Sequence, residues 1–227
     1  MVRSKLAVFA VVLLVLSVYA GVSAATSTTT TIPAFVGDSN VLLATGPLAE
    51  QFVLREDSYP FVIVARSGAG LRFSSCPGGA EPCATNQYWR SRLAAVRAKV
   101  QPDVYVVNLG VNDTAAPGTA TTPGFVGYPK KIDDFLALLG NRPVLWTNLP
   151  CVIEPAARRL GCSVVNAALR AAPARHPNLT VLDWAAFADP HPGYMAAFLG
   201  GVHYTPVGYA AWTKLVATAL ESRFGHT

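Results

Sequence analysis

Short apolar runs alternate with longer amphipathic stretches along most of the chain. Mostly apolar runs, typical of buried strands, lie at residues 34–36, 61–65, 104–109, 144–147 and 180–183. Apolar residues recur with helical spacing at residues 41–52, 88–100, 131–139, 164–172 and 207–224. Apolar strands that alternate with helices indicate a parallel sheet covered on both faces. We therefore expect one flavodoxin-like, three-layer α/β/α domain with about five parallel strands.

The N-terminal part of the chain has a different pattern. Residues 1–25 begin with a short basic stretch, continue as an apolar run and end in small residues that include Ala24 and Ala25. This order predicts a secretory signal peptide cut near its last residues. An uncleaved membrane anchor is the alternative, because about 19 apolar residues can span a bilayer. Residues 26–33 form a Thr-rich tether, so we expect a domain at residues 34–227 that is secreted or held in the cell envelope.

The cysteines agree with export. Cys76 and Cys83 flank a stretch rich in Pro and Gly, and Cys151 and Cys162 flank a second short segment. Four cysteines allow three pairings. We expect the two local disulfides, because each would close a loop that has few other constraints. A structural zinc site would favour Cys-x2-Cys spacing, which neither pair has, so we expect no metal.

Composition and charge narrow the range of functions. Of the 227 residues, 52% are hydrophobic and 14% are charged, which excludes a disordered chain. A chain of this length suggests one domain, and we expect it to be a monomer. The formal net charge of +5 is spread along the sequence without a Lys/Arg run, so nucleic-acid binding has little support.

Candidate chemistry follows the predicted strands. In a parallel α/β sheet, sites form beyond the carboxyl ends of the strands. Ser39 follows the first predicted strand, a Gly-rich turn at residues 66–70 follows the second, and Asn112 follows the third. His203 stands just before the last helix. Acyl transfer needs these groups: a nucleophile, a base for its proton, and donors directed at the oxyanion.

Three segments resemble the motifs of the SGNH hydrolase family, also called GDSL-type esterases. Gly-Asp-Ser-Asn at residues 37–40 stands where the family has Gly-Asp-Ser-Leu. Gly-Val-Asn-Asp at residues 110–113 resembles its Gly-x-Asn-Asp block, and residues 203–209 resemble its histidine block. Each motif is weak alone, but all three stand in the family's order. The resemblance covers residue 34 to the end and is closest to small extracytoplasmic bacterial SGNH domains, including those attached to membrane O-acyltransferases.

The resemblance implies roles for individual residues. Ser39 would be the nucleophile that forms an acyl-enzyme, and His203 would be its general base. The oxyanion would be held by the backbone N–H groups of Ser39 and Gly68 and by the side-chain amide of Asn112, with Gly70 as the second choice of glycine. Without the other motifs, Ser39 would be read as a helix N-cap and Asn112 as a turn residue.

One position departs from the family. Three residues before the histidine the family usually has Asp, which orients the imidazole, but this chain has Gly200. A backbone carbonyl near Gly200 would leave a Ser–His dyad, or Asp189 or Asp183 would supply the carboxylate. The remaining alternative is a domain that has lost activity and only binds carbohydrate or the cell envelope. His191 is a rival base that lacks the motif around it.

Other chemistries have no support in the sequence. It has no Gly-x-Ser-x-Gly elbow, no phosphate-binding loop and no His-Glu-x-x-His zinc motif. We expect no cofactor, and a small acyl ester or an acylated glycan as the substrate. Trp146 and Trp184, on predicted strands, are expected in the core.

Overall fold

The computed structural model describes residues 31–53, 60–71, 85–115, 127–152, 156–196 and 201–225. Within them, five strands form one sheet in the order β2-β1-β3-β4-β5, with every neighbouring pair parallel. The strands are β1 (Pro33–Gly37), β2 (Val62–Ala65), β3 (Val104–Asn108), β4 (Val144–Thr147) and β5 (Leu179–Leu182). The predicted parallel sheet and α/β fold are confirmed.

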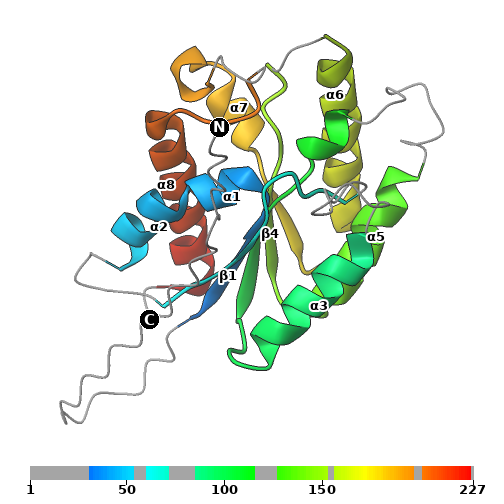
Figure 1. Ribbon diagram of the computed structural model, residues 1–227, viewed down its shortest axis with the longest axis vertical. Helices are drawn as coiled ribbons and strands as arrows, with labels where there is room; N and C mark the ends of the chain where they lie inside the picture. Colours follow the sequence, from blue (N-terminus) through cyan, green and yellow to red (C-terminus); the bar gives the residue numbers. More distant parts are fainter. Residues whose placement is uncertain are drawn as a thin grey trace, which may run out of the picture.

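Helices cover both faces of this sheet (Figure 1). The α-helices are α1 (Ser39–Leu43), α2 (Thr45–Phe52), α3 (Thr85–Arg97), α5 (Tyr128–Leu139), α6 (Ala156–Ala171), α7 (Trp184–Ala188) and α8 (Pro206–Phe224). Short 3-10 turns occur at η1 (Asn112–Ala115), η2 (Ala172–Ala174) and η3 (Pro192–Tyr194).

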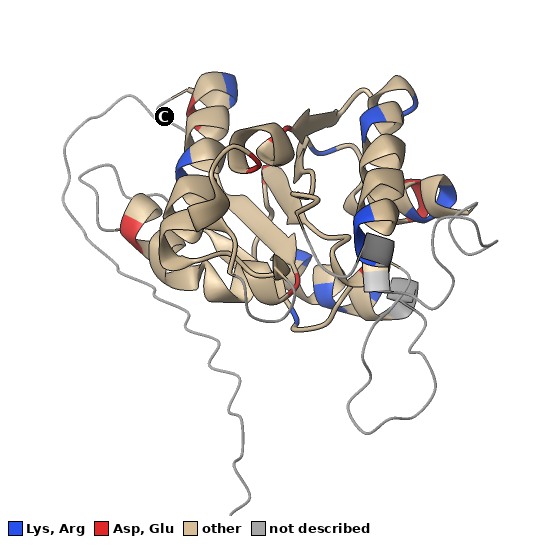
Figure 2. Ribbon diagram, turned by 90° about the horizontal axis from the view of Figure 1, so that it is seen from above, with Lys and Arg blue, Asp and Glu red and all other residues tan. Residues whose placement is uncertain are grey.

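Alternation along the strands divides the core in two. Tyr105 and Val107 of β3 belong to the core under α3, α5 and α6. Val104 and Val106 belong to the opposite core, with residues of α1, α2, α7 and α8. Successive side chains of a strand point to opposite faces, so a continuous apolar run supplies both cores. None of the five strands contains a charged residue, and the charges lie on helices and loops (Figure 2).

Three expected elements differ from the structure, and one is the helix predicted at residues 164–172, which is α6 (Ala156–Ala171) and begins well before residue 164. The helix predicted at residues 41–52 is two helices that meet at Ala44. Pro47 lies in the first turn of α2, where its missing N–H costs nothing, but inside one continuous helix it would lose the bond to the carbonyl of Leu43. Trp184, expected on a strand, is the first residue of α7, because the carboxylate of Asp183 caps the helix there. Trp184 and Trp146 are both fully buried, as expected.

The predicted disulfide between Cys151 and Cys162 is present, with Cα atoms 5.6 Å apart. It joins the segment after β4 to α6. The predicted pair Cys76–Cys83 lies outside the described residues, as do the predicted signal peptide and most of the tether. Within the described ranges, no helix is both long enough and apolar enough to cross a membrane.

Candidate active site

Ser39 is the first residue of α1, directly beyond the carboxyl end of β1. The turn that presents it depends on two preceding residues. A side chain at Gly37 would overlap Val41 and the carbonyl of Asn108, so only glycine fits there. Asp38 caps α1, because its Oδ1 accepts a hydrogen bond from the Asn40 N–H at 2.9 Å. Asp38 therefore supports the turn around Ser39, as expected from the sequence.

The structure brings Ser39 and His203 together. Ser39 Oγ and His203 Nε2 are 2.9 Å apart, although 164 residues separate them in the sequence. The backbone of residues 203–205 is held by the segment that contains η3. The His203 carbonyl accepts a hydrogen bond from the Ala196 N–H, and the Thr205 N–H donates to the Tyr194 carbonyl, both at 2.8 Å.

The environment of His203 suits a base. Partial burial lowers the pKa of the imidazole below its ordinary value, because a charged ring loses solvation there. His203 is therefore neutral at pH 7 and can accept a proton at Nε2. His191, the rival base, is engaged elsewhere: its Nδ1 is 2.9 Å from the Phe187 carbonyl, and its ring stacks on Tyr194.

The candidates for the third member of the site have different surroundings. Asp183 Oδ1 accepts hydrogen bonds from Asn148 Nδ2 at 2.6 Å and from the Ala186 N–H at 3.1 Å. The bond from Ala186 makes Asp183 the N-cap of α7, and the bond from Asn148 holds the carboxylate in place. Burial and the nearby charge of Asp183 raise the pKa of Asp189, while a hydrogen bond from the backbone of Cys151 lowers it. Gly200 lies outside the described residues.

Two glycines follow β2, and they differ. Gly68 has a φ of +73°, a conformation that favours glycine, and it lies in the turn where an oxyanion donor was expected. Gly70 has another reason to be glycine. A side chain there would overlap the carboxylate of Asp113, and the Gly70 carbonyl accepts a hydrogen bond from Trp89 Nε1 at 3.1 Å. The geometry thus ties Gly70 to packing under the turn.

Asn112 is the first residue of η1 and connects three segments. Its Nδ2 donates to the Ala69 carbonyl at 2.8 Å and to Asp38 Oδ2 at 3.1 Å. The amide therefore lies between the turn after β1 and the turn after β2, where the expected oxyanion donors are. Both of its N–H bonds are directed at protein acceptors, so donation to an oxyanion requires one of them to be shared or exchanged.

The carboxylates behind the site are buried. Asp38 has no exposed surface, and burial raises its pKa to about 7, with the neighbouring charge of Asp113 adding to the shift. Asp113 Oδ2 accepts hydrogen bonds from the Leu71 N–H at 2.8 Å and from the Tyr128 hydroxyl at 3.0 Å. Asp113 therefore joins the turn after β2 to η1 and α5, and so orders the loop that carries Asn112.

Asn40 was not singled out by the sequence analysis. It is 2% exposed, and its amide contacts both the His203 loop and α8. The available signal was the motif itself, since this chain has Asn where the family has Leu. Among the residues that the structure describes, no group of three or more His, Cys, Asp or Glu side chains is placed to hold a metal ion.

The model of the GDSL-like lipase/acylhydrolase family matches residues 35–211, so the chain belongs to that family. This is the family that the three sequence motifs resemble, and it consists of lipases and acylhydrolases. No curated protein matches the chain.

Solved structures share the fold. The catalytic domain of peptidoglycan O-acetyltransferase A from Streptococcus pneumoniae has 18% identity and a TM-score of 0.61, covering 85% of this chain and 94% of its own. A carbohydrate acetylesterase family member from Sinorhizobium meliloti has 14% identity and a TM-score of 0.61, with 86% and 99% covered. A lipase/acylhydrolase from Enterococcus faecalis has 16% identity and a TM-score of 0.59, with 85% and 96% covered.

Proposed function

We propose that the protein is an exported serine esterase or O-acyl transferase that acts on small acyl or O-acetyl esters. The observation that carries the proposal is the 2.9 Å contact between Ser39 Oγ and His203 Nε2 at the carboxyl edge of the sheet. A nucleophile and a base within hydrogen-bond distance are the core of acyl-transfer catalysis. Membership of a family of lipases and acylhydrolases supports the same chemistry.

The reaction follows from these two side chains. Ser39 Oγ attacks the ester carbonyl while its proton passes to His203 Nε2. The tetrahedral intermediate collapses, the bond to the leaving alcohol breaks, and the imidazolium returns the proton to that alcohol. Water, or the hydroxyl of an acceptor, then attacks the acyl-enzyme and loses its proton to His203. Collapse of the second intermediate releases an acid or a new ester, and Ser39 regains its proton.

The proposed oxyanion donors are the N–H groups of Ser39 and Gly68 and the amide of Asn112. The turns that contain them meet at Asn112, whose Nδ2 contacts Asp38 and the Ala69 carbonyl. Backbone donors that are already fixed by the fold stabilise developing negative charge without reorganisation, whereas the Asn112 amide must share or exchange one of its present bonds.

Two observations support export, and a third supports an acylated glycan as the substrate. The Cys151–Cys162 disulfide is typical of proteins in oxidising compartments, and the N-terminal residues have the pattern of a signal peptide. Structures with the same fold include a peptidoglycan O-acetyltransferase and a carbohydrate acetylesterase family member. An O-acetyl group on a cell-envelope sugar is therefore the first substrate to test.

The test combines covalent labelling with turnover. Purified protein is treated with a fluorophosphonate and assayed on a panel of short acyl esters and acetylated sugars. We expect one label per chain on Ser39, and loss of nearly all turnover in Ser39→Ala and His203→Ala, because members of one catalytic unit fail together. Ser163→Ala and His191→Ala are matched controls that should keep full activity, since Ser163 is exposed on α6 and His191 contacts Phe187.

The same assay examines what orients His203. If a backbone carbonyl does so, Asp189→Asn and Asp183→Asn should each retain most activity, whereas loss of a triad carboxylate lowers kcat by roughly 10⁴-fold. A wild-type protein that takes no label between pH 6 and 9 and hydrolyses no ester would contradict the proposal and favour a binding domain.

A further inference from the structure

The residue after the candidate nucleophile lies in a buried polar contact between the two halves of the site. Asn40 is the second residue of α1, and its side chain reaches the segment that carries His203. Its Nδ2 donates to the Val202 carbonyl at 3.0 Å, and its Oδ1 accepts from the Tyr209 hydroxyl at 3.0 Å. These two contacts span 162 and 169 residues of sequence. The Asn40 amide thus joins α1 to the residue before His203 and to the first turn of α8.

The orientation of this amide is fixed by its partners. Burial raises the pKa of Tyr209 to about 12, so its hydroxyl keeps its proton at neutral pH and donates to Asn40. The Val202 carbonyl is only an acceptor, so it requires the amide nitrogen. The backbone N–H of Asn40 is held by Asp38 Oδ1 at 2.9 Å. Asn40 therefore has a single arrangement that satisfies all of its neighbours.

We propose that Asn40 is a positioning residue that holds His203 against Ser39. The inference rests on the proposed function and assigns a role that the family motif, with Leu at this place, does not contain. Asn40 follows Ser39 in the chain and Val202 precedes His203, so the Nδ2–carbonyl bond connects the backbones that carry the two reacting side chains. Small displacements matter here, because a misplacement of about 1 Å can lower a rate by roughly 10²-fold.

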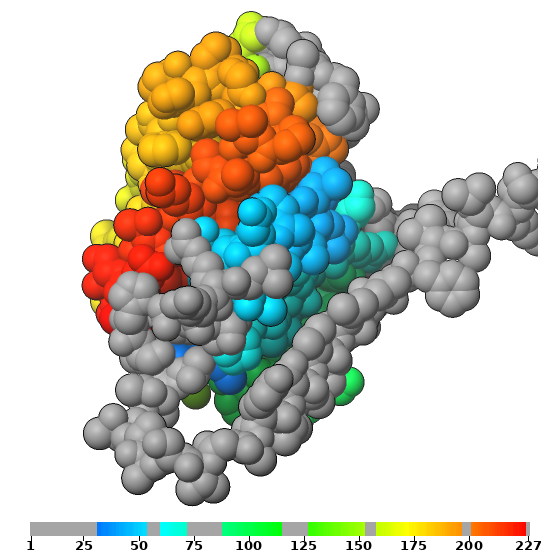
Figure 3. Space-filling model, turned by 90° about the vertical axis from the view of Figure 1, so that its left-hand side faces the viewer, coloured from blue at the N-terminus to red at the C-terminus, as the bar shows by residue number. Residues whose placement is uncertain are grey.

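The fold does not depend on this amide alone. Helix α2 packs directly against α8, and Figure 3 shows the blue segment of α1 and α2 beside the orange-red segment of the chain. Leu48 of α2 and Trp212 of α8 belong to one apolar core that also contains Phe35 of β1. This packing should hold the elements together when the polar contact is removed. Loss of Asn40 should then shift the imidazole rather than unfold the protein.

Two substitutions separate alignment from packing. Asn40→Asp keeps the shape and the acceptor for Tyr209 but removes the donor to Val202, and Asn40→Leu removes both. We expect each to slow fluorophosphonate labelling of Ser39 by roughly 10- to 100-fold and to lower kcat far more than it raises KM. For Asn40→Asp, the deficit relative to wild type should shrink as the pH falls, because a protonated carboxyl can donate to the Val202 carbonyl.

Asn166→Asp is the matched control. Asn166 is also buried, and its Oδ1 and Nδ2 bond to the N–H and carbonyl of Leu149, on the other face of the sheet. It should lower the melting temperature without changing the labelling rate of the folded protein. If the wild-type protein is labelled and the folded Asn40 variants react within about two-fold of its rate, the inference is overturned. If Asn40→Leu does not fold, the result for Asn40→Asp decides. A wild-type protein that takes no label would overturn the proposed function and this inference with it.

Discussion

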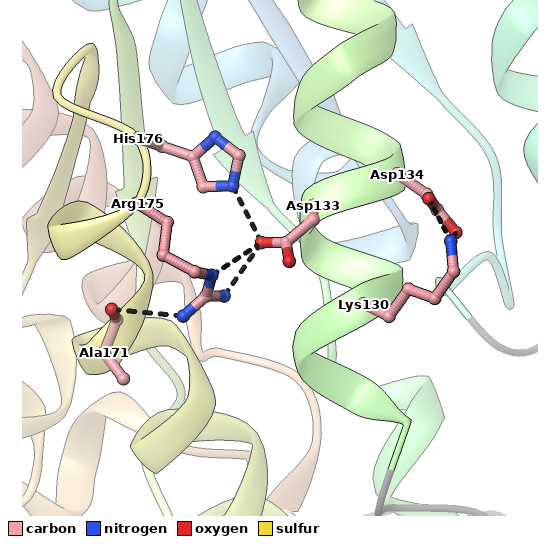
Figure 4. Close-up of polar contacts among 6 residues, drawn as sticks. All are labelled: Lys130, Asp133, Asp134, Ala171, Arg175 and His176. Atoms are coloured by element: carbon pink, nitrogen blue, oxygen red, sulfur yellow. Dashed lines mark hydrogen bonds and ion pairs between the residues drawn. The ribbon is translucent and has the colours of Figure 1, made fainter.

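Asp38 and Asp133 lie in two different environments of this molecule, and their pKa values shift in opposite directions. Asp38, behind the candidate site, has no exposed surface and is hydrogen-bonded by neutral N–H groups of Asn40 and Asn112. Burial dominates and raises its pKa to about 7. Asp133, on α5, is about a third exposed and lies against Arg175 and His176 (Figure 4). The hydrogen bond from Arg175 lowers its pKa, with a further contribution from His176.

The difference teaches what each region contributes. The neutral donors to Asp38 do not offset the solvation that its carboxylate loses on burial. The charged form of Asp38 therefore destabilises the folded chain next to the candidate site. The charges around Asp133 remain in water, where an ion pair is screened and contributes little. We therefore expect substitutions at the carboxyl edge of the sheet to have large effects on activity or stability, and substitutions in the Asp133 cluster to have small ones.

Among the residues around the Ser39–His203 pair, the largest effect should come from Asn112. Asn112→Ala removes the amide between the Asp38 and Gly68 turns and should lower kcat by roughly 10²–10³-fold if the amide faces the oxyanion. Ester turnover by the folded protein measures this effect. A change of less than a few-fold, together with a lower melting temperature, would assign Asn112 to structure alone.

A substitution at Asp113 tests the buried hydrogen bonds behind the candidate site without changing Ser39 or His203. Asp113→Ala removes the Oδ2 atom that accepts from the Leu71 N–H and the Tyr128 hydroxyl, so we expect a loss of about 3 kcal/mol in the free energy of unfolding. Urea denaturation measures it. Asp134→Ala, which removes an exposed pair with Lys130, is the control and should change stability by less than about 0.5 kcal/mol. Equal effects of the two substitutions would contradict the comparison.

Asp38 should make stability depend on pH. The pKa of Asp38 is about 7 in the folded chain and ordinarily 3.8, so between these values the folded state binds a proton that the unfolded state does not. Its contribution to the free energy of unfolding therefore falls as the pH rises through this window. Between pH 5 and pH 8 we expect a decline of about 2–3 kcal/mol from this group. Thermal unfolding of wild type and Asp38→Asn across that range should show the decline in wild type only.

The smallest effect should come from the surface cluster. Asp133→Asn should cost less than about 1 kcal/mol at pH 7, and the cost should diminish in high salt, since the pair is partly exposed. Because the folded pKa of Asp133 is lowered, its stabilising effect is present above the unfolded value of about 4 and is lost as the pH falls below it. Chemical denaturation at low and high salt measures both effects. A loss above about 2 kcal/mol for Asp133→Asn would contradict the idea that exposure makes the Asp133 cluster less important than the candidate site.

The sheet could be predicted from the alternation of apolar strands with helices, and the meeting of Ser39 with His203 from the resemblance of their segments to the family's serine and histidine motifs. The Cys151–Cys162 disulfide could be predicted from spacing. The Asn40 amide could not, because its partners are a backbone carbonyl and a tyrosine hydroxyl more than 160 residues away. The break at Ala44 and the start of α7 at Trp184 were also missed, because apolar periodicity does not register a proline in a first turn or an Asp cap.

Ser39 and His203 lie far apart in the sequence, so the pair would form late in folding. Ser39 follows β1, the first strand in the described part of the chain, while His203 stands shortly before α8, the last helix described there. Contacts between such distant segments form late, because the intervening chain must be ordered before they become favourable. A chain that emerges from a membrane N-terminus first would thus expose its serine long before the imidazole arrives. The docking of residues 201–225 would then be the step that completes the proposed catalytic pair.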